Sequence, residues 1–480
     1  MSQEISSTKS SLRTASVRPI KTGRPPDRFL GTRNTPDTLA ICVGMLLVIA
    51  IAIGGGGVRY GIANLVAQLT ALALLAAFRE SFFQFWKASP IGLRFLVCAT
   101  LAVPTVQLIP LPEAIWTSLP GRELAFEARA AIGSKGWAPL SLDSARTVVA
   151  LTGLIVPLTV LAIGWNASRD QIVALGWIVA AMGLVNLALG VGQTTSSDPM
   201  ASFYPEIPMQ GVLFGTFANR NSAGIFLVCA LILCALLPFP RRRRFVLPAR
   251  VSVCVLLVAA IVLTRSRSAL VLCVVPAVLV ALKLASSSFR SRDGNVRIRL
   301  RFGVLFAGLL LVALAGTSVF VMAPGRVRDV IERFDRSSNP RVYIWEDALY
   351  TSDKYWPVGA GMGTFDEVFQ ADESLENLTQ RRAGRAHNDY LEVAIESGMA
   401  CVILVAAWLA AWLFLTWRAR LSSDRWIAWT GSAILLAIAL QSIVDYPLRN
   451  QAMLSVAALA FLLLARCAEP EEEGQEVIRV

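Results

Sequence analysis

The chain has 480 residues, of which 55% are hydrophobic and only 16% are charged, and its formal net charge is +12. This composition excludes a disordered chain and an ordinary soluble enzyme, and it indicates a polytopic membrane protein. The positive charge would suit a nucleic-acid-binding protein, but the arginines gather between hydrophobic segments, where they orient a membrane protein. We therefore expect no nucleic-acid partner.

Residues 1–36 are rich in Ser, Arg and Pro, and they are too long and too polar for a signal peptide, so we predict a disordered, basic cytoplasmic tail. Hydrophobic segments of the length that crosses a bilayer, about 20 residues, then lie near 38–55, 61–78, 91–109, 147–164, 172–192, 220–238, 247–264, 268–284, 302–322, 389–415, 426–444 and 451–466. The predicted fold class is an all-α polytopic membrane protein with about 12 transmembrane helices. Nine of them fall in 37–322 and three in 389–466, and residues 467–480 form a second tail.

The connections between these segments differ in charge. Three short ones are strongly basic, namely RRRR (241–244), FRSRDGNVRIRLR (289–301) and WRAR (417–420), whereas GGGG (54–57) and TSSD (195–198) carry few charges. Short basic loops stay in the cytoplasm, so both termini are predicted to be cytoplasmic. The longer segments 110–146, 193–219 and 323–388 are then outside, and a bacterial inner membrane is the expected location.

The large outer loop, 323–388, has helical patterns of its own. Val327, Val330, Ile331 and Phe334 recur at helical spacing and predict an amphipathic helix. A second helix follows, with Asn339 as N-cap, Pro340 in the first position and Arg341 in the first turn. An arginine at a helix N-terminus suits an anion, although an ordinary capped surface helix fits the same residues.

Two further patterns are interpreted as structural. GAGMGTF (359–365) follows no predicted strand, so we expect a tight turn and no dinucleotide site. All eight cysteines lie in or beside hydrophobic segments, which predicts small core residues without disulfides or a CxxC site. One histidine cannot build a zinc site, and the acidic pairs Asp366/Glu367 and Asp372/Glu373 are expected to be solvated, so no metal is predicted.

Arginines on the outer side stand close to the hydrocarbon, where charges are costly and mark function by default. They are Arg220 between Asn219 and Asn221, Arg265 and Arg267 between two spans, and Arg341 in the outer loop. Guanidinium groups match phosphate oxygens bidentately and remain charged. Because ATP is absent outside the cell, the predicted ligand is a lipid-linked phosphate or pyrophosphate. The alternative is that Arg265 and Arg267 only anchor helix ends.

His387 is the single histidine, in RAHNDYLEVAIESG (385–398). A lone histidine is more often structural, but Asn388, Asp389 and Tyr390 can orient this ring, and imidazole can accept a proton from a hydroxyl near neutral pH. Two glutamates, Glu392 and Glu396, lie on the helical face of Asn388. They are expected to pair with arginines, because carboxylates entering a helix bundle need partners.

Six segments occur in order within residues 200–450: FGTFANRNSAG, LTRSRSAL, NPRVYIWEDAL, GAGMGTF, AHNDYLEVAIESG and SIVDYPLRN. Together they resemble the O-antigen ligase and Wzy polymerase family of bacterial envelope glycosyltransferases. The resemblance implies a membrane glycosyltransferase (GT-C-like) architecture. It also implies transfer of a glycan from undecaprenyl pyrophosphate to an acceptor hydroxyl on the periplasmic side, with no cofactor and no metal.

The same resemblance assigns roles to residues of this chain. Arg220, Arg267 and Arg341 would hold the pyrophosphate, and His387 would activate the acceptor. Arg265, which precedes SRSAL, departs from the family pattern, so either Arg265 or Arg267 could face the pocket. The supporting residues are Asn219, Asn221, Asn388, Tyr390, Glu392, Glu396 and Asp445. A single displacement by the acceptor predicts inversion at the anomeric carbon.

Several functions remain open at this point. The acceptor would be lipid A-core for an O-antigen ligase, another lipid-linked repeat for an O-antigen or exopolysaccharide polymerase, and an exported protein for a protein O-oligosaccharyltransferase. A polysaccharide transporter is the rival from another class, but it would carry charges near mid-bilayer and inverted repeats. Besides the donor and acceptor, membrane lipids are the expected partners.

Overall fold

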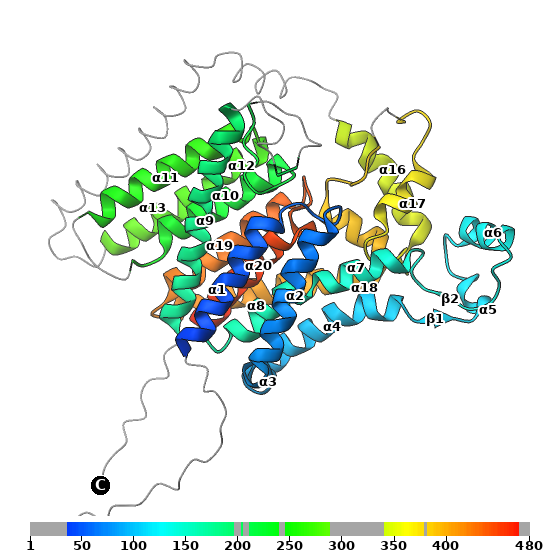
Figure 1. Ribbon diagram of the computed structural model, residues 1–480, viewed down its shortest axis with the longest axis horizontal. Coiled ribbons are helices and arrows are strands. Elements are labelled where there is room, and N and C mark those ends of the chain that lie inside the picture. The colour runs from blue at the N-terminus through cyan, green and yellow to red at the C-terminus, as the bar shows by residue number, and fades with distance from the viewer. Residues whose placement is uncertain are drawn as a thin grey trace, which may run out of the picture. The chain divides into compact units, whose positions relative to one another are not determined.

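The computed structural model describes residues 36–195, 203–204, 211–239, 245–288, 340–378 and 382–469. Within these ranges the chain is mostly helical (Figure 1). Several predictions lie outside the described residues: the N-terminal tail, most of the C-terminal tail, the span at 302–322, the amphipathic helix around 327–334 and the cap at Asn339.

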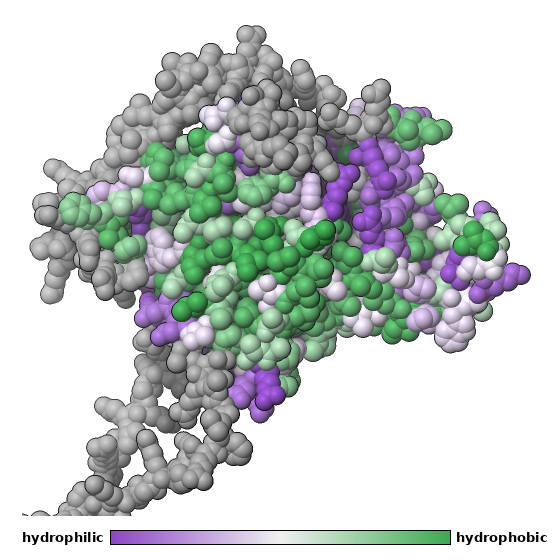
Figure 2. Space-filling view, viewed as in Figure 1, coloured by the Kyte–Doolittle hydropathy of each residue, from purple (hydrophilic) through white to green (hydrophobic). Residues whose placement is uncertain are grey.

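The other predicted spans coincide with hydrophobic helices. These are α1 (Pro36–Ile53), α2 (Gly61–Ala77), α4 (Ile91–Gln107), α7 with α8 (Ser144–Gly153, Ile155–Gly164), α9 (Arg169–Thr195), α10 (Arg220–Leu236), α11 (Val246–Leu263), α12 with α13 (Arg267–Leu272, Val274–Ser288), α18 (Asp389–Arg418), α19 (Arg425–Gln441) and α20 (Gln451–Cys467). Figure 2 shows hydrophobic residues over much of the visible helical surface. The architecture is consistent with a polytopic membrane protein.

Helix length separates these elements into two groups. Five stretches of the described chain are long and hydrophobic enough to cross a membrane, namely Ser144–Gly164, Arg169–Thr195, Val246–Leu263, Arg267–Ser286 and Asp389–Leu421. A sixth results if α2 and the following α3 (Arg79–Ala88), bent by 79°, form one span. The remaining hydrophobic helices are shorter. Among them, α19 and α20 pack closely, and this approach requires a glycine at position 431, since a Cβ there would overlap the carbonyl oxygen of Ala460.

The glycine run between α1 and α2 joins two distant segments at one end of the bundle. Ala218 donates its N–H to the carbonyl of Gly55 (3.2 Å), and Ala452 donates to that of Gly54 (3.4 Å). A Cβ at Gly54 would lie 2.7 Å from the Cβ of Gln451. Only glycine therefore lets the segment before α10 and the first turn of α20 meet the end of α1.

Helix α18 is kinked, and the GAGMGTF turn supports the kink. Gly398 has a φ of 54° inside α18, which frees carbonyl groups of the preceding turn. The N–H groups of Ala360 and Gly361 donate to the carbonyls of Ile395 (2.9 Å) and Glu396 (2.7 Å). The predicted turn is confirmed, and it lies between α16 (Pro340–Tyr355) and α17 (Phe365–Asp372), which share a small hydrophobic core with α18.

Between α4 and α7 the chain folds into a small lobe that the sequence indicated only as a loop. It contains β1 (Pro110–Leu111) paired antiparallel with β2 (Ala138–Pro139), together with α5 (Glu113–Trp116) and α6 (Glu123–Ala131). Arg122 is buried and donates to the carbonyls of Leu140 and Gly359, both at 2.9 Å, which ties the lobe to the α16–α17 turn. Burial lowers the pKa of Arg122 to about 10, so its guanidinium is charged at neutral pH.

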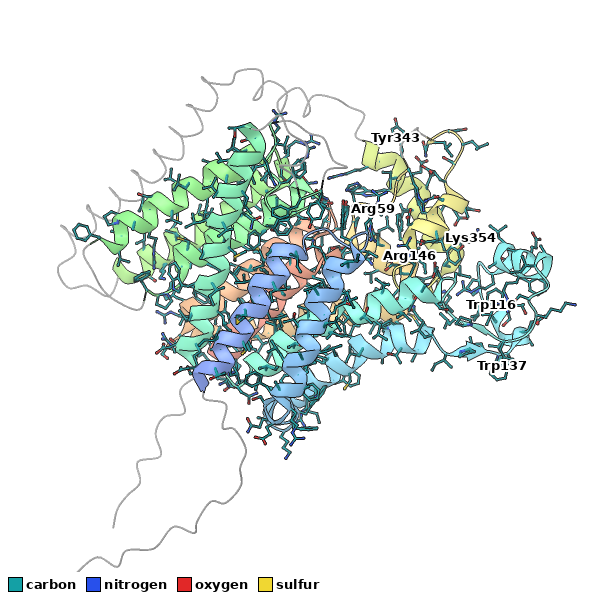
Figure 3. All side chains as sticks on the ribbon, viewed as in Figure 1. Arg59, Trp116, Trp137, Arg146, Tyr343 and Lys354 are labelled. Atoms are coloured by element: carbon teal, nitrogen blue, oxygen red, sulfur yellow. The ribbon has the colours of Figure 1, made fainter. Side chains whose placement is uncertain are left out.

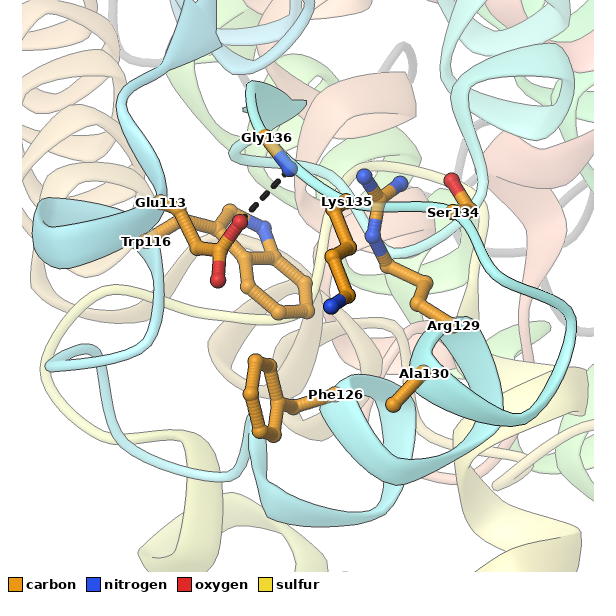
Figure 4. Close-up of a pocket in the computed structure, with 8 residues that line it drawn as sticks. All are labelled: Glu113, Trp116, Phe126, Arg129, Ala130, Ser134, Lys135 and Gly136. Carbon is orange, nitrogen blue, oxygen red and sulfur yellow. Dashed lines mark hydrogen bonds between the residues drawn. The ribbon is translucent and has the colours of Figure 1, made fainter.

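The lobe encloses a pocket of about 40 Å³ (Figure 4). It is lined by Glu113, Trp116, Phe126, Arg129, Ala130, Ser134, Lys135 and Gly136. Glu113 accepts a hydrogen bond of 2.6 Å from the N–H of Gly136 across this space. A cavity of this volume holds only a few water molecules, so it is too small for a sugar ring.

Three of the four residues in the acidic pairs form ion pairs, so the prediction that these pairs are solvated was wrong for Asp366, Glu367 and Asp372. Glu367 pairs with Arg146 (2.8 Å), Asp366 with Arg382 (2.8 Å) and Asp372 with Lys354 (2.6 Å), and Asp372 is only 2% exposed. These pairs fix α17 to its surroundings. All eight cysteines are free thiols. Cys229, Cys234, Cys401 and Cys467 are buried as predicted, and Cys42, Cys254 and Cys273 are half-buried, whereas Cys98 is exposed, so the prediction of a core residue was wrong for Cys98.

Candidate functional site

His387 forms a pair with Asp445 just before α18. The imidazole Nδ1 lies 3.2 Å from Oδ1 of Asp445, whose side chain is 2% exposed, whereas the imidazole is 31% exposed. A carboxylate can only accept, so in the neutral ring Nδ1 carries the hydrogen. Nε2 then keeps a lone pair that can accept a proton from a substrate hydroxyl.

The residues predicted to orient this ring do something else. Asn388 caps α18 by accepting a backbone N–H of its first turn (3.1 Å), and Tyr390 donates its hydroxyl to a carbonyl of α19 (3.0 Å). Asp389 accepts from a serine hydroxyl that follows α19 (3.0 Å). The bonds of Tyr390 and Asp389 hold α18 against α19 and the residue that follows it, and the side chain that orients His387 is Asp445.

Tyr446 connects the histidine to the NRN segment. Its ring centroid lies 5.1 Å from that of His387, and its hydroxyl lies near the side chain of Asn219. Asn219 also caps α10 by accepting the N–H of Asn221 (2.8 Å), which sets Arg220 as the first residue of that helix. Burial, together with an adjacent carboxylate, raises the pKa of Tyr446 above its ordinary value, so the phenol stays protonated and cannot compete as a base.

The NRN and SRS arginines lie at neighbouring helix starts. Arg220 begins α10 and Arg267 begins α12, and these helices pack together. A Cβ at Gly224, one turn after Arg220, would lie 3.0 Å from the Cβ of Ser266, so the glycine allows the close approach. Arg265 precedes this turn with a positive φ of 53°, and both Arg265 and Arg267 are half-buried at this end.

Arg341 lies at the start of α16, a helix that contacts the segment before His387. The helix begins at Pro340, and Arg341 occupies the first turn, as predicted. Trp345 follows one turn later on the same face, and its indole N–H donates to the carbonyl of Ala386 (2.8 Å). Arg341 is therefore about one helical turn, roughly 5–6 Å of rise, from the residue that contacts the peptide before His387.

A buried ionic cluster lies beneath the histidine. Arg449 contacts Asp389 (3.4 Å), Glu392 (3.2 Å) and Glu396 (2.7 Å), and Arg385 contacts Glu392 (3.1 Å). The predicted pairing of the two glutamates with arginines is confirmed. Burial alone would lower the pKa of Arg449, but the three carboxylates outweigh it and raise the pKa, so the guanidinium remains charged.

Sequence reasoning missed Arg449, Arg385, Tyr446 and Trp345 as parts of this arrangement. All four lie inside or directly beside the six segments that resemble the family, so their position in those segments could have marked them as candidate site residues. The polar end of the bundle also includes Arg59 and Arg146, which lie on the side nearest α16 and α17 (Figure 3). Figure 2 shows a hydrophilic band over α16 next to the hydrophobic helices.

Comparison with known protein families matches part of the chain to one of them. Within the part of the chain that the structure describes, no group of three His, Cys, Asp or Glu residues could hold a metal ion. No curated protein matches the chain. Residues 252–406, which include Arg265, Arg267, Arg341 and His387, match the model of the protein family described as O-Antigen ligase, so the chain carries an O-antigen ligase domain, as its sequence predicted.

Proposed function

We propose that the protein transfers a glycan from undecaprenyl pyrophosphate to an acceptor hydroxyl at the periplasmic face of a bacterial inner membrane, as an O-antigen ligase acting on lipid A-core. The O-antigen ligase domain supports a membrane enzyme of the ligase or polymerase type that uses lipid-linked glycans. The proposal rests mainly on the His387–Asp445 pair, and Arg220, Arg267 and Arg341 each lie in the first turn of a helix.

Charge at the opposite end of the bundle supports the orientation. There α18 ends with Arg418 and Arg420 follows it, Lys283 donates to a carbonyl at the end of α10 (2.6 Å), and Arg169 pairs with Asp424 (2.6 Å). Basic residues at helix ends favour the cytoplasmic side. The histidine and the arginines of the site would then face the periplasm, where lipid-linked glycans are joined to their acceptors.

The geometry suits a single displacement. An acceptor hydroxyl that hydrogen-bonds with Nε2 of His387 loses its proton to that nitrogen as its oxygen attacks the anomeric carbon. The bond from that carbon to the pyrophosphate oxygen breaks, and its electron pair leaves with the lipid pyrophosphate. The guanidinium groups of Arg220, Arg267 and Arg341 stabilise the charge that grows on this leaving group.

Asp445 stabilises the imidazolium that forms. Its Oδ2 is buried and has no hydrogen-bond partner among the described residues. A buried carboxylate without such partners is stabilised by a positive charge nearby, so it favours the protonated form of the imidazole. Attack from the face opposite the pyrophosphate inverts the anomeric centre. The arginines supply the positive charge that the reaction needs, and His387 supplies the base, so we expect transfer without an added metal.

Deletion of the gene, followed by analysis of the envelope glycans, tests the proposal. A ligase deletion leaves full-length glycan on the lipid carrier and lipid A-core without glycan. Single repeats on the core would instead indicate a polymerase, and loss of glycan from an exported protein alone would indicate a protein O-oligosaccharyltransferase. An unchanged glycan profile, or one restored by a His387→Ala gene, would contradict the proposed function.

A further inference from the structure

The backbone at His387 adopts a conformation that non-glycine residues rarely adopt. Its φ is 52°, in the left-handed region. Such a residue persists only where its surroundings determine the conformation more strongly than its own preference does. The residue before it, Ala386, is completely buried, so the relevant contacts are those of the Ala386 peptide groups.

Both polar groups of Ala386 are held by side chains. The N–H donates to Oε1 of Glu392 (2.9 Å), and the carbonyl accepts the indole N–H of Trp345 (2.8 Å). Glu392 is on α18 and Trp345 is on α16, so the N–H and the carbonyl of Ala386 are held by two different helices. Together with the Asp445 contact on Nδ1, three separate elements set the position of His387.

The Glu392 carboxylate is itself fixed. Its Oε2 accepts from Arg385 (3.1 Å) and lies 3.2 Å from Nε of Arg449, and its side chain is 0% exposed. The two guanidinium groups occupy one oxygen, which leaves Oε1 directed at Ala386. A Gln at this position would keep its carbonyl toward the arginines, and it would then present an NH₂ group to the N–H of Ala386, where no hydrogen bond can form.

Trp345 also links the clamp to the predicted pyrophosphate site. It stands four residues after Arg341, so the two side chains share one face of α16. A shift of α16 would therefore move the arginine and the histidine together. This provides a physical reason for the spacing between the arginine and the tryptophan in NPRVYIW.

We propose that Trp345 and Glu392 are positioning residues, which clamp the Ala386 peptide and thereby hold His387 against Asp445 with Nε2 available to the acceptor. The clamp deepens the proposed function and depends on it for its catalytic consequence. Neither side chain is placed against the substrate. Their effect is on the orientation and tautomer of the imidazole.

The single histidine of the chain allows a direct test. In full-length protein with ¹⁵N-labelled histidine, held in lipid nanodiscs and purified with a tag that lacks histidine, every imidazole signal belongs to His387. The wild type is expected to show one state with the hydrogen on Nδ1. Trp345→Phe keeps an aromatic ring but removes the N–H, so a second tautomer or a broadened resonance is expected.

Trp408→Phe is the matched control, because it removes another indole hydrogen bond, to Thr100 at 3.0 Å, away from the site. It should leave the imidazole spectrum unchanged. Glu392→Gln is the second test variant and should also produce a second state. If Trp345→Phe does not fold, the spectrum of Glu392→Gln decides. Wild-type spectra in the folded test variants would overturn the clamp.

Kinetics supply the second measurement. With a lipid-linked glycan donor and an acceptor lipid, Trp345→Phe should lower kcat by about 10- to 100-fold, the effect of a misplaced catalytic group, with little change in KM for the donor. A raised KM with unchanged kcat would mean that Trp345 serves donor binding, and the proposal would be wrong. If the wild type transfers no glycan, the proposed function fails, whereas the spectra still report on the clamp.

Discussion

Replacement of Asp445 by Asn isolates the role of the histidine–carboxylate pair. The two side chains have nearly the same shape, so the buried position after α19 remains filled. Asn can present either its carbonyl oxygen or its NH₂ group to Nδ1, which now lies 3.2 Å from a carboxylate oxygen. When the NH₂ group faces the ring, the hydrogen moves to Nε2, and the imidazole can no longer accept a proton from the acceptor.

The expected magnitude follows from the type of bond that is lost. A hydrogen bond to a charged group contributes about 1.5–3 kcal/mol. If that stabilisation is present mainly when the imidazole is positively charged, its loss raises the barrier by the same amount, which lowers kcat by roughly 10- to 150-fold. His387→Ala should lower kcat further, by about 10²- to 10⁴-fold, because the general base itself is removed.

The assay is transfer of glycan from a purified lipid-linked donor to an acceptor, measured for both single variants and the double variant. Because Asp445 acts through His387, the double variant should be no slower than His387→Ala alone. Multiplicative losses in the double variant would show that the two residues act independently. Full activity of Asp445→Asn would refute the assigned role outright.

Three further outcomes are expected from other parts of the molecule. Arg449→Met leaves three carboxylates without their shared partner and should destabilise the protein by about 3–5 kcal/mol, measured as a lower thermal unfolding midpoint. Arg169→Met removes an exposed ion pair and should change the midpoint little, so equal midpoints for the two variants would contradict a stabilising role of the buried cluster. Arg220→Ala should raise the activation barrier for glycan transfer by about 2–4 kcal/mol, measured as a lower kcat/KM. Arg129→Ala, in the lobe between α4 and α7, is the control, and equal kcat/KM values for the two variants would show that Arg220 does not act in the site. In Gly361→Ala, at a residue with a φ of 119°, the new methyl group would overlap the hydroxyl of Ser141. The variant should therefore have a lower unfolding midpoint than Gly133→Ala, where φ is 72° and the space around the residue is open. The reverse order of midpoints would refute this packing.

Hydropathy predicted most helices because a membrane span is defined by its own residues. The segments that became α9 and α18, for example, are identified by length and composition alone. Hydropathy could not predict the kink at Gly398, because that kink is stabilised by N–H groups of Ala360 and Gly361 in a separate segment. Nor did it indicate the lobe, whose α5 and α6 are short and have exposed hydrophobic side chains such as Ile115 and Leu124.

The site was predictable in its parts but not in its pairings. Residue type identified His387 and the arginines as candidates, because charged and titratable side chains this close to the hydrocarbon are costly and mark function by default. The partners were assigned less well, because Asp445 is 58 positions from His387 along the chain and sequence proximity favoured Asn388 and Tyr390. Arg449 was overlooked because its three carboxylate partners lie on another helix.

The most direct test of the account is reconstitution in nanodiscs with an undecaprenyl-pyrophosphate-linked glycan and lipid A-core as the only substrates. We predict that the wild type forms glycosylated lipid A-core and releases one undecaprenyl pyrophosphate for each glycan transferred, with an inverted anomeric centre and no need for added metal. His387→Ala should insert normally and transfer glycan about 10²- to 10⁴-fold more slowly than the wild type. Transfer by His387→Ala at the wild-type rate, or a product with retained anomeric configuration, would contradict the account.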